Sequence, residues 1–329
     1  MRKWFLLTTF GCVAGGVLAA DPFHVGLPVE CAFGSLCAVQ NYVDLDPGPG
    51  RLDPGCGRLS YDGHDGTDIR VRDLVAMRDG VPVVAAAAGV VKATRDGMAD
   101  VSVRAVGVEA VAGREAGNGV LIDHGGGWET QYSHLRSGSV VVEPGDRVEA
   151  GTPLGLVGLS GQTEFPHLHF TLRKGGVAID PFTGTAGGWT CGSATSPVWT
   201  AEAERVLAYV PTGLLIAGFS STRPEAEAIR RGDQRLGATA RDPDALILWA
   251  DVFGAQAGDE QAFRIVGPDG AVLLDSTSVL EENNVSWFAF GGRARPPNGW
   301  TPGTHVGTYS LSRGGREIVV QEVEVAIVK

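Results

Sequence analysis

HLHFTLR, at residues 167–173, is the stretch of sequence that decides the fold. Polar and apolar residues alternate along it, which is typical of a β-strand with one face packed on a core. Successive side chains on a strand point to opposite faces, so His167 and His169 share one face and Leu168 lies on the other. Two adjacent imidazoles are costly to bury for packing alone. By itself, the pair is compatible with a metal site and also with an accidental surface feature.

The sequence around this stretch has the same strand-like character from Asp68 to Asp180. Short apolar or alternating runs, as at 81–93, 119–135 and 152–158, are separated by glycines. The chain has 48 glycines without a collagen period, and we interpret them as turns between strands. These patterns predict a mainly β fold built on an antiparallel sheet.

The second half of the chain is also rich in strand-like runs. It follows a Gly-, Ser-, Thr- and Pro-rich segment at 183–197 that lacks periodicity. The runs at 245–253 and 262–274 are strand-like, and the second predicts a hairpin that turns at residues 268–270. PEAEAIRRG at 224–232 is the only stretch that clearly predicts a helix. We therefore expect a small β-sandwich-like domain at 205–329.

The first twenty residues form a separate segment. A basic pair, Arg2 and Lys3, precedes an apolar stretch at 4–18 that ends in Ala19 and Ala20. This order is typical of a secretory signal peptide. The stretch contains three glycines and is shorter than the roughly 20 apolar residues of a membrane span. We expect residues 1–20 to be removed, no later membrane span, and a periplasmic or secreted protein.

The charge balance of the remaining chain limits its partners. Removing residues 1–20 takes away two of the 27 basic residues and none of the 38 acidic ones, which leaves 25 − 38 = −13. An acidic protein of this kind is a poor candidate for binding nucleic acid or anionic surfaces through bulk charge. We therefore expect no nucleic-acid partner.

Four cysteines remain after residue 20: Cys31, Cys37, Cys56 and Cys191. An even number in an exported chain favours two disulfides, for which three connectivities are possible. We prefer Cys31–Cys37, which closes a short local loop, and Cys56–Cys191, which ties the ends of one domain together.

A second group of polar residues lies in GHDGTDI at 63–69. His64 and Asp68 are four residues apart, and the glycines beside them indicate a tight loop that enters a strand. By itself this segment is best explained as a polar turn. Together with His167 and His169, however, it supplies imidazoles and a carboxylate. A catalytic zinc site requires three such protein ligands and an open fourth position for water.

At this point the sequence resembles the lysostaphin/LytM-type zinc endopeptidases of peptidoglycan. The resemblance extends from about Tyr61 to Pro181 and rests on an ordered series of motifs. They are HDGTD at 64–68, VVAAAAGVV at 83–91, GNGVLIDHG at 117–125, YSHL at 132–135, PGDRVEAGTPLG at 144–155, GLSGQTEFPHLHF at 158–170 and DP at 180–181. Each motif alone is weak, whereas the ordered series is specific.

The resemblance implies a role for each residue of the site. His64, Asp68 and His169 are expected to hold Zn²⁺, while His134 and His167 act on the attacking water and the scissile carbonyl without binding the ion. Which of these two histidines is the general base stays open, and Tyr61 is a candidate oxyanion donor. The implied substrate is the peptide portion of peptidoglycan, with hydrolysis of its cross-links by a D,D-endopeptidase.

The expected organisation follows from these assignments. A signal peptide at 1–20 and an irregular lead-in at 21–60 precede a zinc endopeptidase domain at 61–190. A linker region at 183–204 leads to the β-sandwich-like domain at 205–329. The sequence of this last domain shows no catalytic cluster and no basic patch. A role in docking a protein partner or positioning substrate is expected for it.

Three other functions are compatible with parts of this sequence pattern. A non-catalytic regulator of cell-wall amidases shares the fold, but such relatives typically lose metal ligands, whereas all five site residues are present here. A biotinyl- or lipoyl-type carrier is excluded because no lysine lies between Lys92 and Lys174 to carry the group. A peptidase that acts on Gly-rich proteins has the same site chemistry and stays open.

Overall fold

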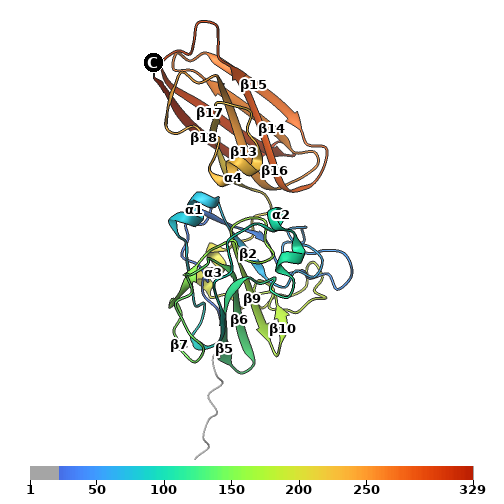
Figure 1. Cartoon of the computed structure of the whole chain (residues 1–329). Helices are drawn as coiled ribbons and strands as arrows, with labels where there is room; N and C mark the ends of the chain where they lie inside the picture. The colour runs from blue at the N-terminus through green and yellow to red at the C-terminus, as the bar shows by residue number, and fades with distance from the viewer. Residues whose placement is uncertain (1–21, 329) are drawn as a thin grey trace, which may run out of the picture.

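The computed structural model describes residues 22–328, and it consists of two β-rich units stacked end to end (Figure 1). The prediction of a mainly β protein with antiparallel sheets is confirmed. The predicted signal peptide at 1–20 lies outside the described residues. Among the helices that are described, none is long and apolar enough to cross a membrane.

The first unit is built on an eight-stranded sheet. Its strands, in spatial order, are β1 (Cys37–Asn41), β2 (Thr67–Val71), β9 (His167–Lys174), β6 (Trp128–Leu135), β5 (Asn118–Gly125), β4 (Gly89–Arg95) and β7 (Arg147–Val148), and β10 (Val177–Ile179) pairs with β9. A separate pair joins β3 (Pro82–Val84) to β8 (Pro153–Leu156). All the pairings in this unit's sheets are antiparallel.

Strand β9 positions the site because it lies between β2 and β6. Leu168, Phe170 and Leu172 alternate into the core of the first unit and are buried there. The intervening side chains, including those of His167 and His169, therefore occupy the opposite face of the sheet. The apolar half of the HLHFTLR pattern thus fixes the strand, and the polar half lines the site.

Strand β1 lies inside the segment that was expected to be an irregular lead-in. It pairs antiparallel with β2, and Asn41 aligns with Asp68. This five-residue run, CAVQN, lacks an alternating pattern, and four of its residues are buried. Such a short, buried edge strand gives little periodic signal in the sequence.

Helices are few and short. The predicted helix at 224–232 is confirmed as α4 (Ala226–Arg231), which ends at Gly232 in the left-handed conformation. Four other short helices lie within residues 22–328, have four to six residues each and were not predicted from the sequence. They are α1 (Leu74–Asp79), α2 (Val103–Val106), the 3₁₀ helix η1 (Val108–Val111) and α3 (Ala201–Val206).

The second unit consists of two further sheets with an apolar core between them, as predicted for a β-sandwich-like domain. The first contains β11 (Gly213–Ser220), β13 (Ala245–Ala255) and β16 (Asn284–Ala294). The second contains β12 (Thr239–Arg241), β18 (Arg316–Val328), β17 (Gly303–Arg313), β14 (Glu260–Val266) and β15 (Val272–Val279). The hairpin expected to turn at 268–270 is formed by β14 and β15. The pairing of β12 with β18 is parallel.

The two units are packed together. Leu215 and Phe253 come from the second unit but belong to the apolar core of the first. Helices α1, α2 and α4 lie at the junction (Figure 1). Within the segment expected to be a linker, Trp199 and Ala203 are buried in the same core as Leu215. The expected domain limits themselves stay a prediction.

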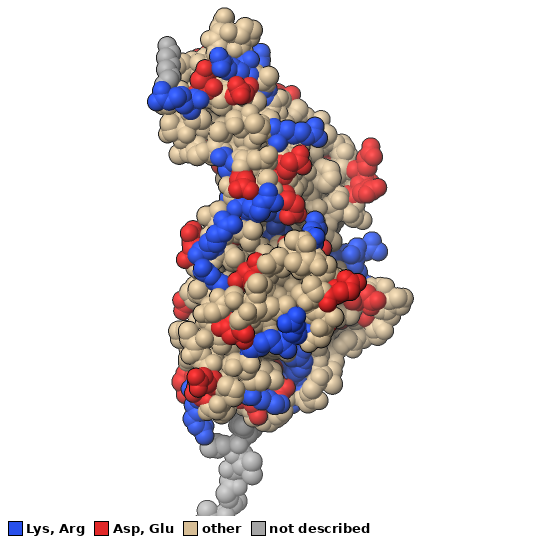
Figure 2. All heavy atoms as spheres, viewed as in Figure 1, with Lys and Arg blue, Asp and Glu red and all other residues tan. Residues whose placement is uncertain are grey.

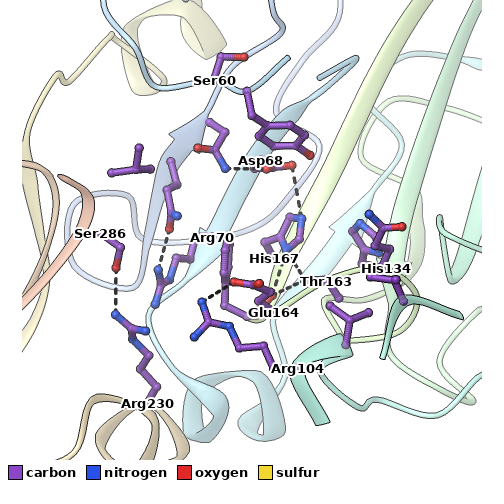
Figure 3. Close-up of a pocket in the computed structure, with 18 of the residues that line it drawn as sticks. Ser60, Asp68, Arg70, Arg104, His134, Thr163, Glu164, His167, Arg230 and Ser286 are labelled. Atoms are coloured by element: carbon purple, nitrogen blue, oxygen red, sulfur yellow. Dashed lines mark hydrogen bonds and ion pairs between the residues drawn. The ribbon is translucent and has the colours of Figure 1, made fainter. Parts of the chain in front are cut away.

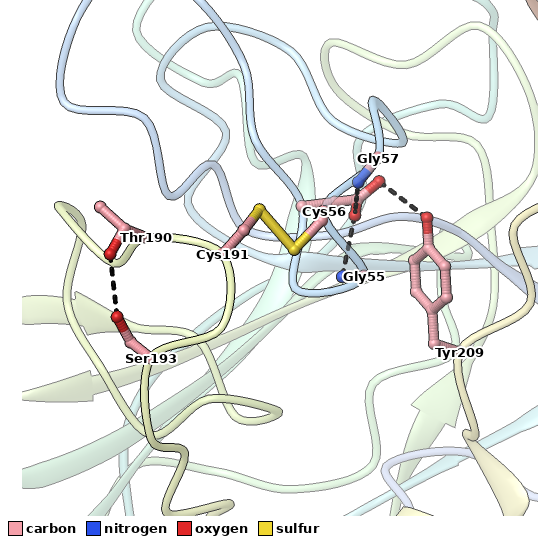
Figure 4. The surroundings of a disulfide bond; sticks show 8 residues. Gly55, Cys56, Gly57, Thr190, Cys191, Ser193 and Tyr209 are labelled. Carbon is pink, nitrogen blue, oxygen red and sulfur yellow. Dashed lines mark hydrogen bonds between the residues drawn. A yellow bond between two sulfur atoms is a disulfide. The ribbon is translucent and has the colours of Figure 1, made fainter.

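Both preferred disulfides are present. Cys31 is bonded to Cys37, and Cys56 is bonded to Cys191, 135 residues further along the chain. Figure 4 shows the second bond joining the loop around Gly55 and Gly57 to the segment that precedes α3. In that loop, the buried Asp53 carboxylate accepts hydrogen bonds from the backbone N–H groups of both glycines. A covalent tie and a hydrogen-bonded turn therefore hold the lead-in to the end of the first unit.

We expect the mature protein to begin near Asp21 and to carry no free thiol, because paired cysteines are the default in an oxidising compartment. Intact mass after treatment with an alkylating reagent tests this. The native protein should gain no adduct without reductant, and after reduction it should gain one at each of its four cysteines. Alkylation of native, exported protein would contradict the pairing.

Candidate active site

The three predicted metal ligands lie together at one end of β2 and β9. His64 belongs to the loop before β2, Asp68 lies on β2, and His169 lies opposite Asp68 on β9. The Nε2 atom of His64 is 3.2 Å from Oδ1 of Asp68 and 3.3 Å from Nδ1 of His169. Nδ1 of His169 is 2.9 Å from the same Asp68 oxygen. Although His64 and His169 are 105 residues apart in the sequence, their ring nitrogens and Oδ1 of Asp68 form a small triangle.

This triangle fits a tetrahedral zinc ion. Zinc binds nitrogen and carboxylate oxygen at about 2.0–2.2 Å, so ligand atoms around a tetrahedral ion are separated by about 3.3 Å. The measured separations of 2.9–3.3 Å are close to that value. Two imidazoles and one carboxylate are also the donor set of a catalytic zinc site, in which a fourth position stays open for water, rather than of a closed structural one.

The groups behind His64 and Asp68 orient their ligand atoms. Nδ1 of His64 lies 2.6 Å from the backbone carbonyl of Tyr42 and donates to it, so Nε2 is the ring nitrogen that faces the site. The side-chain amide of Asn41 donates to Oδ2 of Asp68 at 2.9 Å, so Oδ1 is the oxygen that faces the histidines. Both supporting residues come from the end of β1 and the residue after it.

His169 is oriented in a corresponding way by Asp65. Its Nε2 lies 3.1 Å from Oδ1 of Asp65, and Arg173 donates to the other oxygen of that carboxylate at 3.0 Å. Such a carboxylate behind a histidine fixes the ring and raises its basicity. Gly66 allows the close approach, because a Cβ atom there would lie 2.5 Å from Nε2 of His169. A larger residue in place of the glycine of HDGTD would therefore collide with the imidazole of His169.

The carboxylates and imidazoles of the site shift one another's pKa values and favour the charged forms of Asp65, Asp68 and His169. Burial alone would raise the pKa of Asp68, but His64, His167 and His169 hold it well below its usual range. Hydrogen bonding from His169 lowers the pKa of Asp65 to about 2. Burial opposes protonation of His169, yet hydrogen bonds to Asp65 and Asp68 raise its pKa to about 9. Both carboxylates are therefore ionised at neutral pH, and a metal ion binding at Nδ1 of His169 displaces a proton.

His134 and His167 lie beside the three ligand residues. His134 is the penultimate residue of β6, and its Nδ1 donates to the Ser160 carbonyl at 2.7 Å. His167 opens β9, and its Nδ1 donates to the Phe165 carbonyl at 2.9 Å. Their ring centroids are 4.7 Å apart. Each imidazole is thus held through Nδ1, and Nε2 of His167 lies 3.4 Å from Oδ1 of Asp68, the oxygen that faces the other site histidines.

The backbone and charge of His134 are also unusual. Its φ of +63° lies in the left-handed region, which costs energy for a non-glycine residue and is found preferentially at functional sites. Burial, together with the neighbouring His167 and His169, holds the pKa of His134 well below its ordinary value. The imidazole is therefore neutral near pH 7 and able to accept a proton.

A second grouping of histidines is also close enough to hold a metal. His134, His167 and His169 place ring nitrogens within 4.8 Å of one another, as do His64, Asp68 and His169. The two groupings share His169. The triad with Asp68 supplies a carboxylate charge to offset a divalent cation, which the all-histidine grouping lacks.

Tyr61 lies at the mouth of the site. It is half exposed, and its ring centroid is 4.3 Å from that of His64. Partial burial and the carboxylates of Asp68 and Asp65 raise the pKa of Tyr61 above its ordinary value. The phenol therefore stays protonated and can donate a hydrogen bond.

Two cavities flank the site and share Tyr61, His134 and Gln162 in their walls. The first, of about 450 Å³, extends past Asp68 and His167 to the second unit (Figure 3). The other, of about 440 Å³, extends past His169 and is lined by the first unit alone. An extended chain can thus pass on both sides of the site.

The residues that support the proposed ligands were not predicted from the sequence. Asp65 and Arg173 lie inside quoted motifs, HDGTD and HLHFTLR, so their proximity to the ligands was readable from the strand pattern. Asn41 and Tyr42 had no such signal because they belong to a segment without periodicity.

Comparison with known proteins agrees with the geometry. Residues 62–181 match the model of peptidase family M23. The chain is 35% identical over 132 residues to peptidoglycan DD-endopeptidase ShyA of Vibrio cholerae, covering 40% of this chain and 25% of that protein. It is 40% identical over 62 residues to murein hydrolase activator EnvC of Escherichia coli, covering 19% of this chain and 14% of that protein.

A solved structure of a zinc-containing peptidase from Vibrio cholerae matches 44% of this chain and 39% of that one. The sequences are 26% identical, and the TM-score is 0.28. The chain spans about a quarter of the length of the first curated relative, so the similarity concerns one domain. Residues 62–181 therefore form a peptidase family M23 domain of the lysostaphin/LytM type, which this chain carries beside a second, β-rich unit.

Proposed function

We propose that the protein is an exported zinc endopeptidase that hydrolyses the peptide cross-links of bacterial peptidoglycan, as a D,D-endopeptidase. One observation carries the proposal above all others. Three donor atoms with zinc-like separations lie beside two further buried imidazoles, at the meeting point of two cavities.

His64, Asp68 and His169 are the proposed ligands of the zinc ion. When bound there, zinc supplies a Lewis acid that activates water and polarises an amide carbonyl. The supporting contacts from Asn41 and Asp65 keep the ligand atoms directed toward the ion without a rearrangement.

The remaining side chains provide the proton transfers. His134 and His167 are held through Nδ1, so each presents Nε2 to the attacking water or to the leaving amine. One accepts the proton from water, and one returns a proton to the departing nitrogen. The phenol of Tyr61 donates to the oxyanion that develops on the scissile carbonyl.

Similarity to a peptidoglycan DD-endopeptidase supports the substrate. A cross-link joins two peptide stems, so the enzyme must accommodate peptide on both sides of the cleaved amide. We propose that each of the two cavities that meet at the site binds one of the two peptide stems. In a thin-walled bacterium the bond would join D-Ala to meso-diaminopimelate.

A periplasmic or secreted location is part of the proposal. The two disulfides favour an oxidising compartment, and the predicted signal peptide provides the route. The second unit is proposed to position substrate or to contact a protein partner.

Digestion of purified sacculi by the zinc-loaded protein, followed by separation of the muropeptides, tests the function. We expect cross-linked dimers to disappear with a matching gain of monomers. Chelator-treated protein is the control and should leave the dimers intact. Release of free peptide stems from glycan would instead indicate an amidase. Unchanged sacculi would favour an amidase regulator or a protein substrate.

A further inference from the structure

Both units line the cavity of about 450 Å³ beside the proposed zinc ligands. The second unit contributes four residues from α4 and β16, namely Glu227, Arg230, Val285 and Ser286. Figure 3 shows Arg230 and Ser286 on one side of this cavity and His134 on the other. The second unit therefore forms one wall of the cleft in which substrate would lie.

Arg230 is held rigidly in this wall. Its Nε and Nη2 atoms donate to the two oxygens of Asp251 at 2.7 and 2.9 Å, a bidentate geometry that fixes the plane of the guanidinium group. Asp251 is fully buried on β13. Nη2 of Arg70 from the first unit lies 3.7 Å from Oδ2 of the same carboxylate. The buried carboxylate thus interacts with an arginine from each unit.

Further contacts hold this wall against the first unit. Arg235, just after α4, donates from Nη1 to Oδ2 of Asp73 at 2.9 Å, and Asp73 caps the start of α1. Leu215 and Phe253 pack into the core of the first unit. The position of Arg230 relative to the proposed zinc ligands is therefore set by packing, and it does not depend on a flexible tether.

One nitrogen of Arg230 is left without a hydrogen bond. Nη2 also donates to Oγ of Ser286 at 2.9 Å, so Nε and Nη2 are both used. Nη1 makes no hydrogen bond to any of residues 22–328, and its ion-pair partner, the exposed Glu227, is 3.6 Å away. A guanidinium group has five N–H donors, and two of them are on Nη1. Arg230 can therefore bind an acceptor in the cavity without losing its fixed contacts.

The charge of the cavity walls differs from that of the whole chain and is compatible with an anionic acceptor. Its walls contain four arginines and three acidic residues, and one of the acids is the proposed zinc ligand Asp68. These residues sum to 4 − 3 = +1, or to 0 when the buried Asp251 is included, so the cavity is far less acidic than the chain as a whole. The whole chain has a charge of −11. Figure 2 shows Lys and Arg side chains, with Asp and Glu side chains among them, where the two units meet.

The geometry points to Arg230 as a specificity-determining residue that binds a carboxylate of the peptide substrate through Nη1. This inference rests on the proposed function and names a feature of its substrate, a free carboxylate near the cleaved amide. Peptidoglycan stems carry such groups, whereas the interior of a Gly-rich protein does not. Arg230 would therefore favour peptidoglycan stems over Gly-rich proteins, two substrate classes that the zinc site alone does not distinguish.

The test compares two cross-linked muropeptide dimers that differ only at the carboxylate next to the cleaved amide, which is free in one and a carboxamide in the other. We expect the zinc-loaded wild-type chain to prefer the free acid by about tenfold or more in kcat/KM, because the charge-assisted hydrogen bond is lost with the amide. Arg230→Gln should bring this ratio close to one. An unchanged ratio in the variant would overturn the inference, even if both rates fall.

Two further variants keep the result interpretable. Arg230→Gln leaves the buried Asp251 with Arg70 as its nearest cation, so the double variant Arg230→Gln/Asp251→Asn is examined beside it and should also lose the preference. Arg231→Gln is the matched control. Arg231 is the next residue of α4, pairs with Asp233 and does not line the cavity, so its variant should keep the wild-type ratio.

A separate measurement distinguishes failure of the inference from failure of the proposed function. If the wild-type protein hydrolyses neither dimer, the proposed function fails, and binding of the same two dimers is then measured by calorimetry. Tighter binding of the free acid to wild type, lost in Arg230→Gln, would still support the subsite. Equal binding of the two dimers, or no binding, would overturn it.

Discussion

His169→Ala is expected to reduce the zinc content of the purified protein from about one ion per chain to almost none, and to abolish hydrolysis. Its Nδ1 atom lies 2.9 Å from Asp68 and 3.3 Å from His64, so its removal leaves a site with two ligands. Metal analysis after dialysis against zinc-free buffer measures the loss. The expected effect is the largest of all, because both activity and metal depend on it.

His124→Ala is the matched control for this experiment. His124 is a histidine of the same unit, on β5, and its ring contacts the Ala88 carbonyl and the Thr130 hydroxyl, away from the site. That variant should keep its zinc. Because His169 belongs to both groupings that could hold a metal, a second pair of variants separates them. Loss of zinc in His134→Ala together with retention in Asp68→Ala would show that the ligand assignment is wrong.

The ligand residues were predictable because strand geometry and local spacing determine most of the site. Alternation in HLHFTLR puts His167 and His169 on one face, and the pairing of β2 with β9 then brings Asp68 opposite His169. The sequence motifs identify which strands these are. What they do not contain is the register between strands, which determines the separations of 2.9–3.3 Å.

The contribution of the second unit to the cleft was not predictable. Its role depends on how the surfaces of the two units pack against each other, and no local sequence pattern predicts that packing. In the sequence, Arg230 is an ordinary charged residue of a predicted helix. Asp251 is a single polar residue within an apolar, strand-like run. Only the packing of the β11–β13–β16 sheet against the first unit brings these two residues beside Arg70. Side chains that connect two domains are therefore recognised from the folded structure, because the local sequence around them has no distinctive pattern.

His134→Ala and His167→Ala are expected to retain zinc and to lose about 10²–10⁴-fold in kcat, with KM little changed. Each imidazole is proposed to transfer a proton in the transition state, so its loss affects turnover more than substrate binding. Zinc content and steady-state kinetics on a cross-linked dimer, with His124→Ala as control, measure both effects. A variant that keeps full turnover would remove that histidine from the catalytic machinery.

The double variant His134→Ala/His167→Ala shows whether the two histidines act together. Their ring centroids are 4.7 Å apart, and both flank the same proposed ligands. If both stabilise one transition state, the loss in the double variant will be smaller than the product of the two single losses, because residues that act as a unit are not additive. A full product would instead indicate that each histidine acts independently of the other. Since the two rings lie side by side next to the same proposed ligands, we expect the non-additive result.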